Sequence, residues 1–149
     1  MSTYPGPVIL SSIDPQGMIL EQRCIRTLVV DDSPSSMRAV CALMQAEPLV
    51  EIVGVATNGV EAIAAVATLS PDLVIMDVNL PLLDGLKAAS ILSRHYPEIR
   101  VVLMSADDSA EIRRQGVLHG ADAVVLKSEI VHGLHTALLE LYSSLYDQA

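Results

Sequence analysis

The chain has 149 residues, of which 51% are hydrophobic, and its formal net charge is −9 at pH 7. This length favours one domain with a single core, and the hydrophobic content is too high for a disordered chain. The negative charge argues against direct binding to nucleic acid or to anionic membranes. No apolar run is long enough to cross a bilayer, and the first residues lack the basic-then-apolar order of a signal peptide, so we expect a cytoplasmic protein.

Residues 1–25 differ in pattern from the rest of the chain. Proline and glycine interrupt regular structure near the start, and two apolar runs then flank the turn-like residues 14–17. This spacing suits either a β-hairpin or a flexible arm, because a hairpin is only marginally stable unless it packs on something. We therefore expect an N-terminal arm or hairpin over residues 1–25, a globular domain over residues 26–146 and a C-terminal tail over residues 147–149.

From Arg26 onward, short apolar runs alternate with segments of helical periodicity. A wholly apolar run without polar alternation is typical of a strand that is covered on both faces of a parallel sheet. Five runs fit this description: residues 27–30, 52–55, 73–76, 101–104 and 123–126. We expect each of them to form one strand of the same sheet.

Helix signals follow each of these runs. Ser33 can cap the first helix, and Asn58 can cap the second with Glu61 three residues further on. The last helix is expected to carry a single apolar stripe from Val131 to Leu145. Five strands alternating with five helices predict an α/β fold with a doubly wound parallel sheet.

Polar side chains stand at the carboxyl ends of four of the five runs. Asp31 and Asp32 follow the first run, Asp77 the third, Ser105 the fourth and Lys127 the fifth. Because parallel strands end at one edge of a sheet, we expect these side chains to lie close together. Three neighbouring carboxylates repel one another, and Mg²⁺ offsets this repulsion because it prefers oxygen ligands. With an added ammonium and hydroxyl, the set suits recognition of a phosphoryl group.

Taken singly, each of these residues has an ordinary explanation. Asp31 and Asp32 could simply start a helix, Asp77 could bond its own backbone in a turn, and Lys127 could be a solvated loop residue. Four strands that end in complementary groups are harder to obtain from capping alone, so we favour a functional site. The chain has no glycine-rich phosphate loop, which argues against a nucleotide site of the P-loop type.

Four segments carry a specific combination of motifs in a specific order. They are residues 28–33 (LVVDDS), 77–85 (DVNLPLLDG), 102–106 (VLMSA) and 120–127 (GADAVVLK). Together they resemble the receiver domains of bacterial two-component response regulators, and the resemblance extends over about residues 25–146. The overall spacing is most similar to receivers that precede a helix-turn-helix DNA-binding domain.

The resemblance implies a flavodoxin-like sheet with the strand order 2-1-3-4-5. It also implies that Asp77 accepts a phosphoryl group from a histidine kinase or a phosphotransfer protein. The implied cofactor is Mg²⁺, held by Asp32, Asp77 and the main-chain carbonyl of Asn79, with Asp31 acting through water. Lys127 would pair with the phosphoryl group.

The resemblance further implies that Ser105 turns toward the phosphoryl group after its transfer. Two positions depart from the family pattern. Val124 stands where the family usually has Tyr or Phe, and Ser128 follows Lys127 where many members have a cis-proline. We expect a trans peptide bond before Ser128, because a non-proline cis bond costs about 3 kcal/mol.

Several functions remain open on the sequence alone. The first is a phosphorylation switch without enzymatic activity beyond its own phosphorylation and dephosphorylation, with possible homodimerisation through the fourth helix, fifth strand and fifth helix. The chain could instead be the receiver half of a DNA-binding transcriptional regulator, or a degenerate receiver that acts only as an interaction module. A Mg²⁺-dependent phosphohydrolase with Asp77 as nucleophile is disfavoured, because the loops are too short for a substrate-covering insertion.

Overall fold

The computed structural model describes residues 8–147. Its strands are β1 (Val8–Ile13), β2 (Ile19–Val30), β3 (Val50–Ala56), β4 (Leu73–Asp77), β5 (Arg100–Ser105) and β6 (Ala123–Leu126). Its helices are α1 (Pro34–Gln45), α2 (Gly59–Leu69), α3 (Gly85–His95), α4 (Ala110–Leu118), the 3₁₀ helix η1 (Lys127–Glu129), α5 (Ile130–Leu141) and α6 (Ser143–Tyr146). None of the helices in this part of the chain is both long and apolar enough to span a membrane.

Five of the strands form the expected parallel sheet. Strand β2 pairs in parallel with β3 on one side and with β4 on the other, and β5 and β6 then follow in parallel. The order β3-β2-β4-β5-β6 corresponds to 2-1-3-4-5 when strands are counted from β2, which confirms the flavodoxin-like topology. In this order β3 and β4 lie on opposite sides of β2, so the strand order reverses between β2 and β4. Ligands of such folds bind at the carboxyl ends of the strands at this point.

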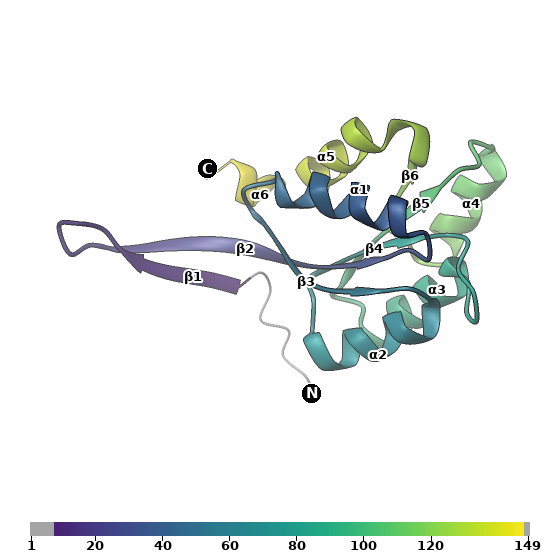
Figure 1. Ribbon diagram of the computed structural model, residues 1–149, viewed down its shortest axis with the longest axis horizontal. Helices are drawn as coiled ribbons and strands as arrows, with labels where there is room; N and C mark the ends of the chain where they lie inside the picture. The colour runs from purple at the N-terminus through teal and green to yellow at the C-terminus, as the bar shows by residue number, and fades with distance from the viewer. Residues whose placement is uncertain (1–7, 148–149) are drawn as a thin grey trace.

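Helices cover both faces of the parallel sheet, and each face has its own apolar cluster (Figure 1). Val74 and Met76 of β4 point to the side of α2, α3 and α4, whereas Leu73 and Ile75 point to the side of α1, α5 and α6. All five residues of β4 are buried, as the continuous apolar run predicted. The core is aliphatic because the sequence contains neither Phe nor Trp.

Strand β2 is longer than the sequence indicated. We expected a strand over residues 27–30, but β2 begins at Ile19, and its first half pairs antiparallel with β1 from Ile13↔Ile19 to Val8↔Cys24. Because residues 21–23 are polar and interrupt the apolar run, the sequence pattern did not predict a strand here. The pairing with β1 stabilises the strand instead. The β1–β2 hairpin projects from the body of the domain (Figure 1), and the boundary proposed after residue 25 falls inside β2.

The C-terminal region also differs from the prediction. A single last helix was expected, and this was wrong: Tyr142 leaves helical geometry with φ −126° and ψ 36°, which separates α5 from α6. The Tyr142 ring is buried and its hydroxyl donates to the carbonyl of Asp72 at 3.3 Å. Val131 was expected in the apolar stripe but is 69% exposed, because α5 turns this position away from the sheet.

Candidate functional site

Asp77 lies at the carboxyl end of β4, the central buried strand. The main chain continues the parallel pairing one residue further, since the Val78 amide donates to the Met104 carbonyl at 2.9 Å. The chain then turns back, and the Gly85 amide donates to the Val78 carbonyl at 2.8 Å. A Cβ atom at Gly85 would lie 2.1 Å from the Asp77 carbonyl oxygen, so only glycine allows this close approach. The pairing of Val78 with β5 and the close approach of Gly85 therefore fix the main chain around Asp77.

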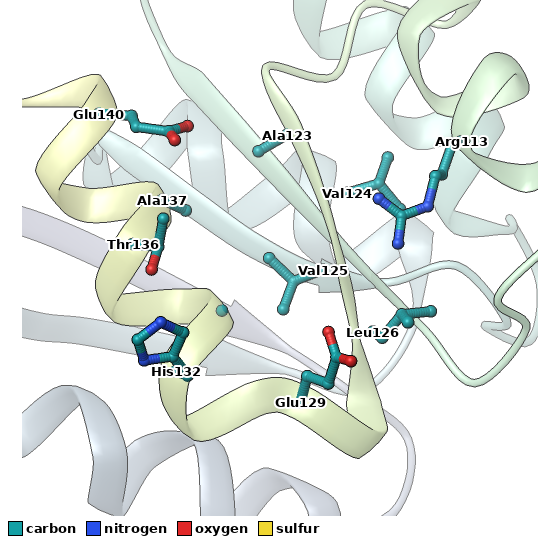
Figure 2. A pocket seen from close by; sticks show the side chains of 11 residues that line it. Arg113, Ala123, Val124, Val125, Leu126, Glu129, His132, Thr136, Ala137 and Glu140 are labelled. Atoms are coloured by element: carbon teal, nitrogen blue, oxygen red, sulfur yellow. The ribbon is translucent and has the colours of Figure 1, made fainter. Parts of the chain in front are cut away.

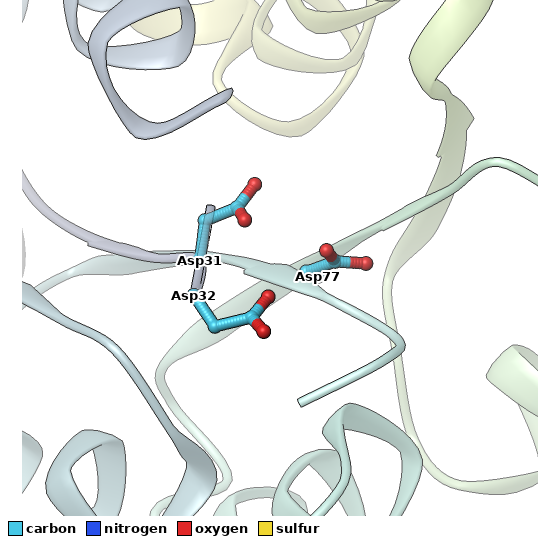
Figure 3. A group of neighbouring side chains, drawn as sticks. All are labelled: Asp31, Asp32 and Asp77. Atoms are coloured by element: carbon cyan, nitrogen blue, oxygen red, sulfur yellow. The ribbon is translucent and has the colours of Figure 1, made fainter. Parts of the chain in front are cut away.

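Asp31 and Asp32 lie beside Asp77 at the end of the neighbouring strand β2. Asp31 is buried and its Oδ1 accepts the amide of Ser33 at 3.0 Å, whereas Asp32 is exposed. Each of the three carboxylates offers an oxygen, and these atoms all lie within 4.8 Å of one another. Figure 3 shows the three side chains beside one another. The parallel order of β2 and β4 thus creates the acidic cluster that the sequence predicted.

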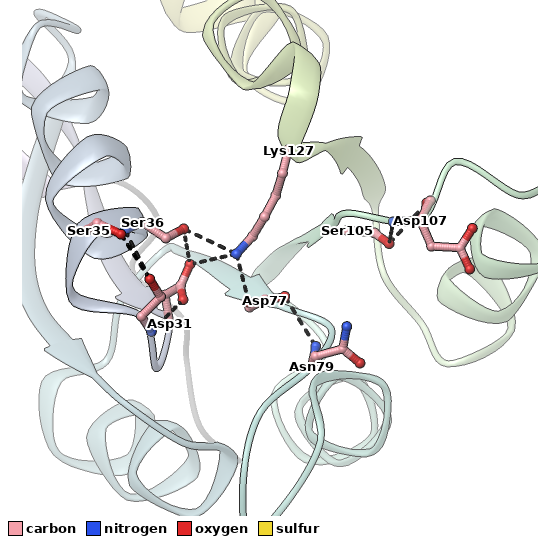
Figure 4. A network of polar contacts seen from close by, with 9 residues as sticks. Asp31, Ser35, Ser36, Asp77, Asn79, Ser105, Asp107 and Lys127 are labelled. Atoms are coloured by element: carbon pink, nitrogen blue, oxygen red, sulfur yellow. Dashed lines mark hydrogen bonds and ion pairs between the residues drawn. The ribbon is translucent and has the colours of Figure 1, made fainter.

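Lys127 reaches the same place from the opposite side, at the end of β6 (Figure 4). Its Nζ donates to Asp77 Oδ2 at 2.8 Å and to Asp31 Oδ2 at 3.1 Å. One ammonium therefore bridges two buried carboxylates whose residues are 50 and 96 positions away in the chain. The peptide bond between Lys127 and Ser128 is trans, as expected, since no peptide bond in residues 8–147 is cis.

Burial and neighbouring charges alter the pKa values of two groups in this cluster. Burial raises the pKa of Asp77 above its usual range; the contacts with Lys127 and the Asn79 amide oppose this shift, and the nearby Asp31 adds to it. Burial by itself would lower the pKa of Lys127, but its hydrogen bonds with Asp77 and Asp31 raise it on balance. A carboxylate that is costly to ionise and an ammonium that stays charged are typical of a functional site.

Two further predicted residues lie at the rim. The main-chain amide of Asn79 donates to Asp77 Oδ1 at 3.2 Å, and Asn79 is exposed directly beside the acidic cluster. Ser105 is buried at the end of β5, where its hydroxyl donates to the Asp107 carbonyl and accepts the Asp107 amide, both at 3.0 Å. In Figure 4 the Ser105 hydroxyl faces its own loop, so it must rotate to contact a group on Asp77.

Sequence reasoning missed Ser36, which belongs to this cluster. Its hydroxyl donates to Asp31 Oδ2 at 2.5 Å and accepts from Lys127 Nζ at 3.1 Å. The residue lies in the first turn of α1, where Ser33 caps the helix as predicted. Its place in the first helical turn after the acidic pair was the available signal, because the contact with Lys127 spans 91 residues of sequence.

The donor set fits Mg²⁺. Carboxylate oxygens are the ligands that Mg²⁺ prefers, and it is usually held by one or two carboxylates together with waters. Asp32 is exposed, and Asp77 has a second oxygen beyond the one bonded to Lys127. Asp31 is less available than Asp77, because it accepts three hydrogen bonds from the protein whereas Asp77 accepts two.

Comparison with known proteins identifies relatives of the chain. A family model described as the response regulator receiver domain matches residues 27–139. A protein-glutamate methylesterase/protein-glutamine glutaminase of Methanosarcina acetivorans is 36% identical over 118 residues, which make up 78% of this chain and 34% of that protein. The transcriptional regulatory protein MctR of Rhizobium johnstonii is 31% identical over 120 residues, which make up 78% of this chain and 56% of that protein.

A solved structure agrees with these matches. The signal receiver domain of the response regulator NarL from Mycobacterium tuberculosis is 32% identical with a TM-score of 0.68, over 76% of this chain and 96% of that one. The chain spans about a third of the methylesterase and just over half of MctR. The family model covers most of the globular region and all the strand ends that build the acidic cluster. The chain therefore belongs to the response regulator receiver domain family.

Proposed function

We propose that the chain is a phosphorylation switch in which Asp77 accepts a phosphoryl group from the phosphohistidine of a histidine kinase or a phosphotransfer protein. An Asp77 carboxylate oxygen attacks phosphorus, and the new P–O bond forms as the P–N bond to the donor imidazole breaks. The leaving imidazole nitrogen takes up a proton, and an acyl phosphate remains on Asp77. The observation that supports this most directly is the buried Asp77 carboxylate with Lys127 Nζ at 2.8 Å and two further carboxylates beside it.

The surrounding residues have complementary roles in this proposal. Asp32, Asp77 and the main-chain carbonyl of Asn79 would hold Mg²⁺, with Asp31 acting through water. Bound there, the metal would neutralise the charge that gathers on the phosphoryl oxygens. Lys127 already points at Asp77 and pairs with the phosphoryl group once it is attached. Ser105 rotates from the Asp107 main chain to donate to the same group, and this rotation couples the site to the loop before α4.

Intact mass spectrometry tests this chemistry. The chain is incubated with acetyl phosphate in the presence and absence of Mg²⁺, and the wild type is compared with Asp77→Asn. We expect one phosphoryl adduct that requires Mg²⁺ and is lost in Asp77→Asn, because the proposed attacking oxygen belongs to Asp77. Asp108→Asn is the matched control, since Asp108 is an exposed aspartate on a nearby loop and should leave the adduct intact. An unmodified wild type, or an adduct that persists in Asp77→Asn, contradicts the assignment.

We further propose that phosphorylation changes pairing of two copies through α4, β6 and α5. Val117 and Leu118 of α4 and Val131 of α5 are each more than two-thirds exposed. Between these helices, β6 forms the floor of a groove of about 540 Å³. Figure 2 shows Arg113 on one side of this groove and Glu140 on the other, an arrangement of charges that suits a two-fold pairing. Light scattering on the phosphorylated sample should show a larger mass than on Asp77→Asn.

Regulation of transcription is a second candidate function, and the similarity to MctR favours it. The prediction is that Asp77→Asn in the native host changes transcript levels in the same direction as loss of the whole gene. A variant that leaves transcript levels unchanged would favour a different output, or an interaction module that does not depend on phosphorylation.

A further inference from the structure

Ser36 makes two hydrogen bonds inside the acidic cluster that have no role in building its own helix. Its hydroxyl donates to Asp31 Oδ2 at 2.5 Å and accepts from Lys127 Nζ at 3.1 Å (Figure 4). The helix cap is made by Ser33, whose side chain accepts the main-chain amide of Ser36. An alanine at this position would therefore keep the cap and would itself favour the helix. The side chain of Ser36 serves the cluster rather than α1.

The Lys127 ammonium has three N–H donors, and each of them has one acceptor in this structure. The acceptors are Asp77 Oδ2 at 2.8 Å, Asp31 Oδ2 at 3.1 Å and Ser36 Oγ at 3.1 Å. A lysine side chain has several rotatable bonds, so two acceptors leave the ammonium free to turn about the line that joins them. The third acceptor removes this freedom. Ser36 thus completes the set that directs Lys127 toward Asp77.

Ser36 also holds Asp31 in one orientation. Asp31 Oδ1 accepts the Ser33 amide, and Oδ2 accepts both the Ser36 hydroxyl and the Lys127 ammonium. Donors on both oxygens hold the carboxylate in this orientation. Because Asp31 accepts three hydrogen bonds and Asp77 only two, Asp77 and the exposed Asp32 are better able than Asp31 to contact a cation directly.

We propose that Ser36 is a positioning residue for phosphoryl transfer, which acts by orienting Lys127 and Asp31 through its hydroxyl. This inference rests on the proposed function of Asp77. The Ser36 hydroxyl bonds to Asp31 and Lys127, and not to Asp77, which carries the attacking oxygen, or to Asp32. Its loss is therefore expected to slow the transfer without weakening the binding of Mg²⁺.

The orientation of Lys127 can be measured without any phosphorylation. The chain has only two lysines, Lys87 and Lys127, and Lys87 is exposed. In the ¹⁵N-labelled chain, an ammonium with three fixed acceptors exchanges its protons slowly with water and gives a sharp NMR signal. We expect this signal in the wild type and in Ser36→Thr, which keeps the hydroxyl, but a broadened or lost signal in Ser36→Ala. A wild type without the signal, or Ser36→Ala with an unchanged one, would overturn the proposal.

The functional measurement separates rate from binding. At saturating Mg²⁺ and acetyl phosphate, Ser36→Ala should gain the phosphoryl group about tenfold more slowly than the wild type. Its dissociation constant for Mg²⁺, measured by calorimetry, should change less than about twofold. Ser36→Thr should restore the rate. A merely structural role predicts instead that rate, Mg²⁺ affinity and the free energy of unfolding all fall together, and that outcome contradicts the proposal.

Ser35→Ala is the matched control for this series. Ser35 is the exposed neighbour of Ser36, and its hydroxyl lies 3.2 Å from that of Ser33 rather than bonding to Lys127 or Asp31. It should keep the wild-type rate, and a loss equal to that of Ser36→Ala would overturn the assignment to Ser36. If the wild type takes up no phosphoryl group, the function proposed for Asp77 fails, whereas the NMR comparison still decides the role of Ser36.

Discussion

The two edges of the parallel sheet use the same side chain in opposite ways. At the amino edge, Asp72 precedes β4 and accepts the amide of Arg26 on the neighbouring strand β2 at 2.9 Å. Asp122 precedes β6 and in the same manner accepts the amide of Val101 on β5 at 2.8 Å. At the carboxyl edge, Asp31 and Asp77 lie close to each other and share the single ammonium of Lys127.

The difference lies in what balances each carboxylate. At the amino edge each aspartate accepts a main-chain amide of the neighbouring strand and so ties two strands together. The main-chain amides that bond Asp31 and Asp77 belong instead to residues two positions further along the chain. Several aspartates around one ammonium retain excess negative charge, and burial makes that charge more costly. The amino edge is thus complete as it stands, whereas the carboxyl edge is suited to a cation and a phosphoryl group. Removing an aspartate should therefore have opposite effects on stability at the two edges.

The largest effect is expected for Asp72→Ala. Asp72 is 2% exposed, and the substitution removes the acceptor of the Arg26 amide at the junction of two strands. The free energy of unfolding should fall by about 2 kcal/mol, the typical loss for a hydrogen bond to a charged group. Urea unfolding measures the change. Asp72→Asn keeps an oxygen at this position and should lose clearly less; equal losses in both variants would show that the bond to Arg26 is not the cause.

A smaller loss is expected for Asp122→Ala. Its carboxylate accepts the Val101 amide and forms an ion pair with Arg100 at 3.2 Å, but its side chain is 25% exposed. Water can replace part of what is lost, so we expect a decrease of about 1 kcal/mol in the same urea experiment. Arg100→Ala tests the ion pair alone and should cost little, because the arginine side chain is half exposed. A larger loss in Arg100→Ala than in Asp122→Ala would reverse this ranking.

Asp77→Asn should have the smallest effect, with the opposite sign. In the absence of Mg²⁺ at pH 7, its free energy of unfolding should exceed that of the wild type by up to about 1 kcal/mol, as is common when a functional charge is removed. Because burial raises the pKa of Asp77 in the folded protein, the wild type becomes more stable as the pH falls through that raised pKa toward the ordinary value of an aspartate. The advantage of Asp77→Asn should therefore shrink on acidification.

A destabilised Asp77→Asn at pH 7 would contradict this comparison. It would mean that the bond between Lys127 and the ionised Asp77 contributes more to stability than burial costs. Adding Mg²⁺ provides a further check, since cation binding should stabilise the wild type and leave Asp77→Asn less affected.

The local pattern of the chain determined the class of fold and most of the site. Apolar runs that alternate with helical segments predict parallel strands, and the ends of parallel strands share one edge whatever the details of packing. Asp31, Asp32, Asp77 and Lys127 could therefore be placed together before any contact was known. The helix cap at Ser33 was equally predictable, because it involves residues three positions apart.

Only the tertiary structure decided which contacts cross the sheet. The extension of β2 to Ile19 depends on pairing with β1, and the end of α5 coincides with Tyr142 leaving helical geometry and reaching Asp72. The roles of Asp72 and Ser36 follow from partners 46 and 91 residues away. Such contacts depend on how the elements pack against one another, and no local pattern in the sequence records that arrangement.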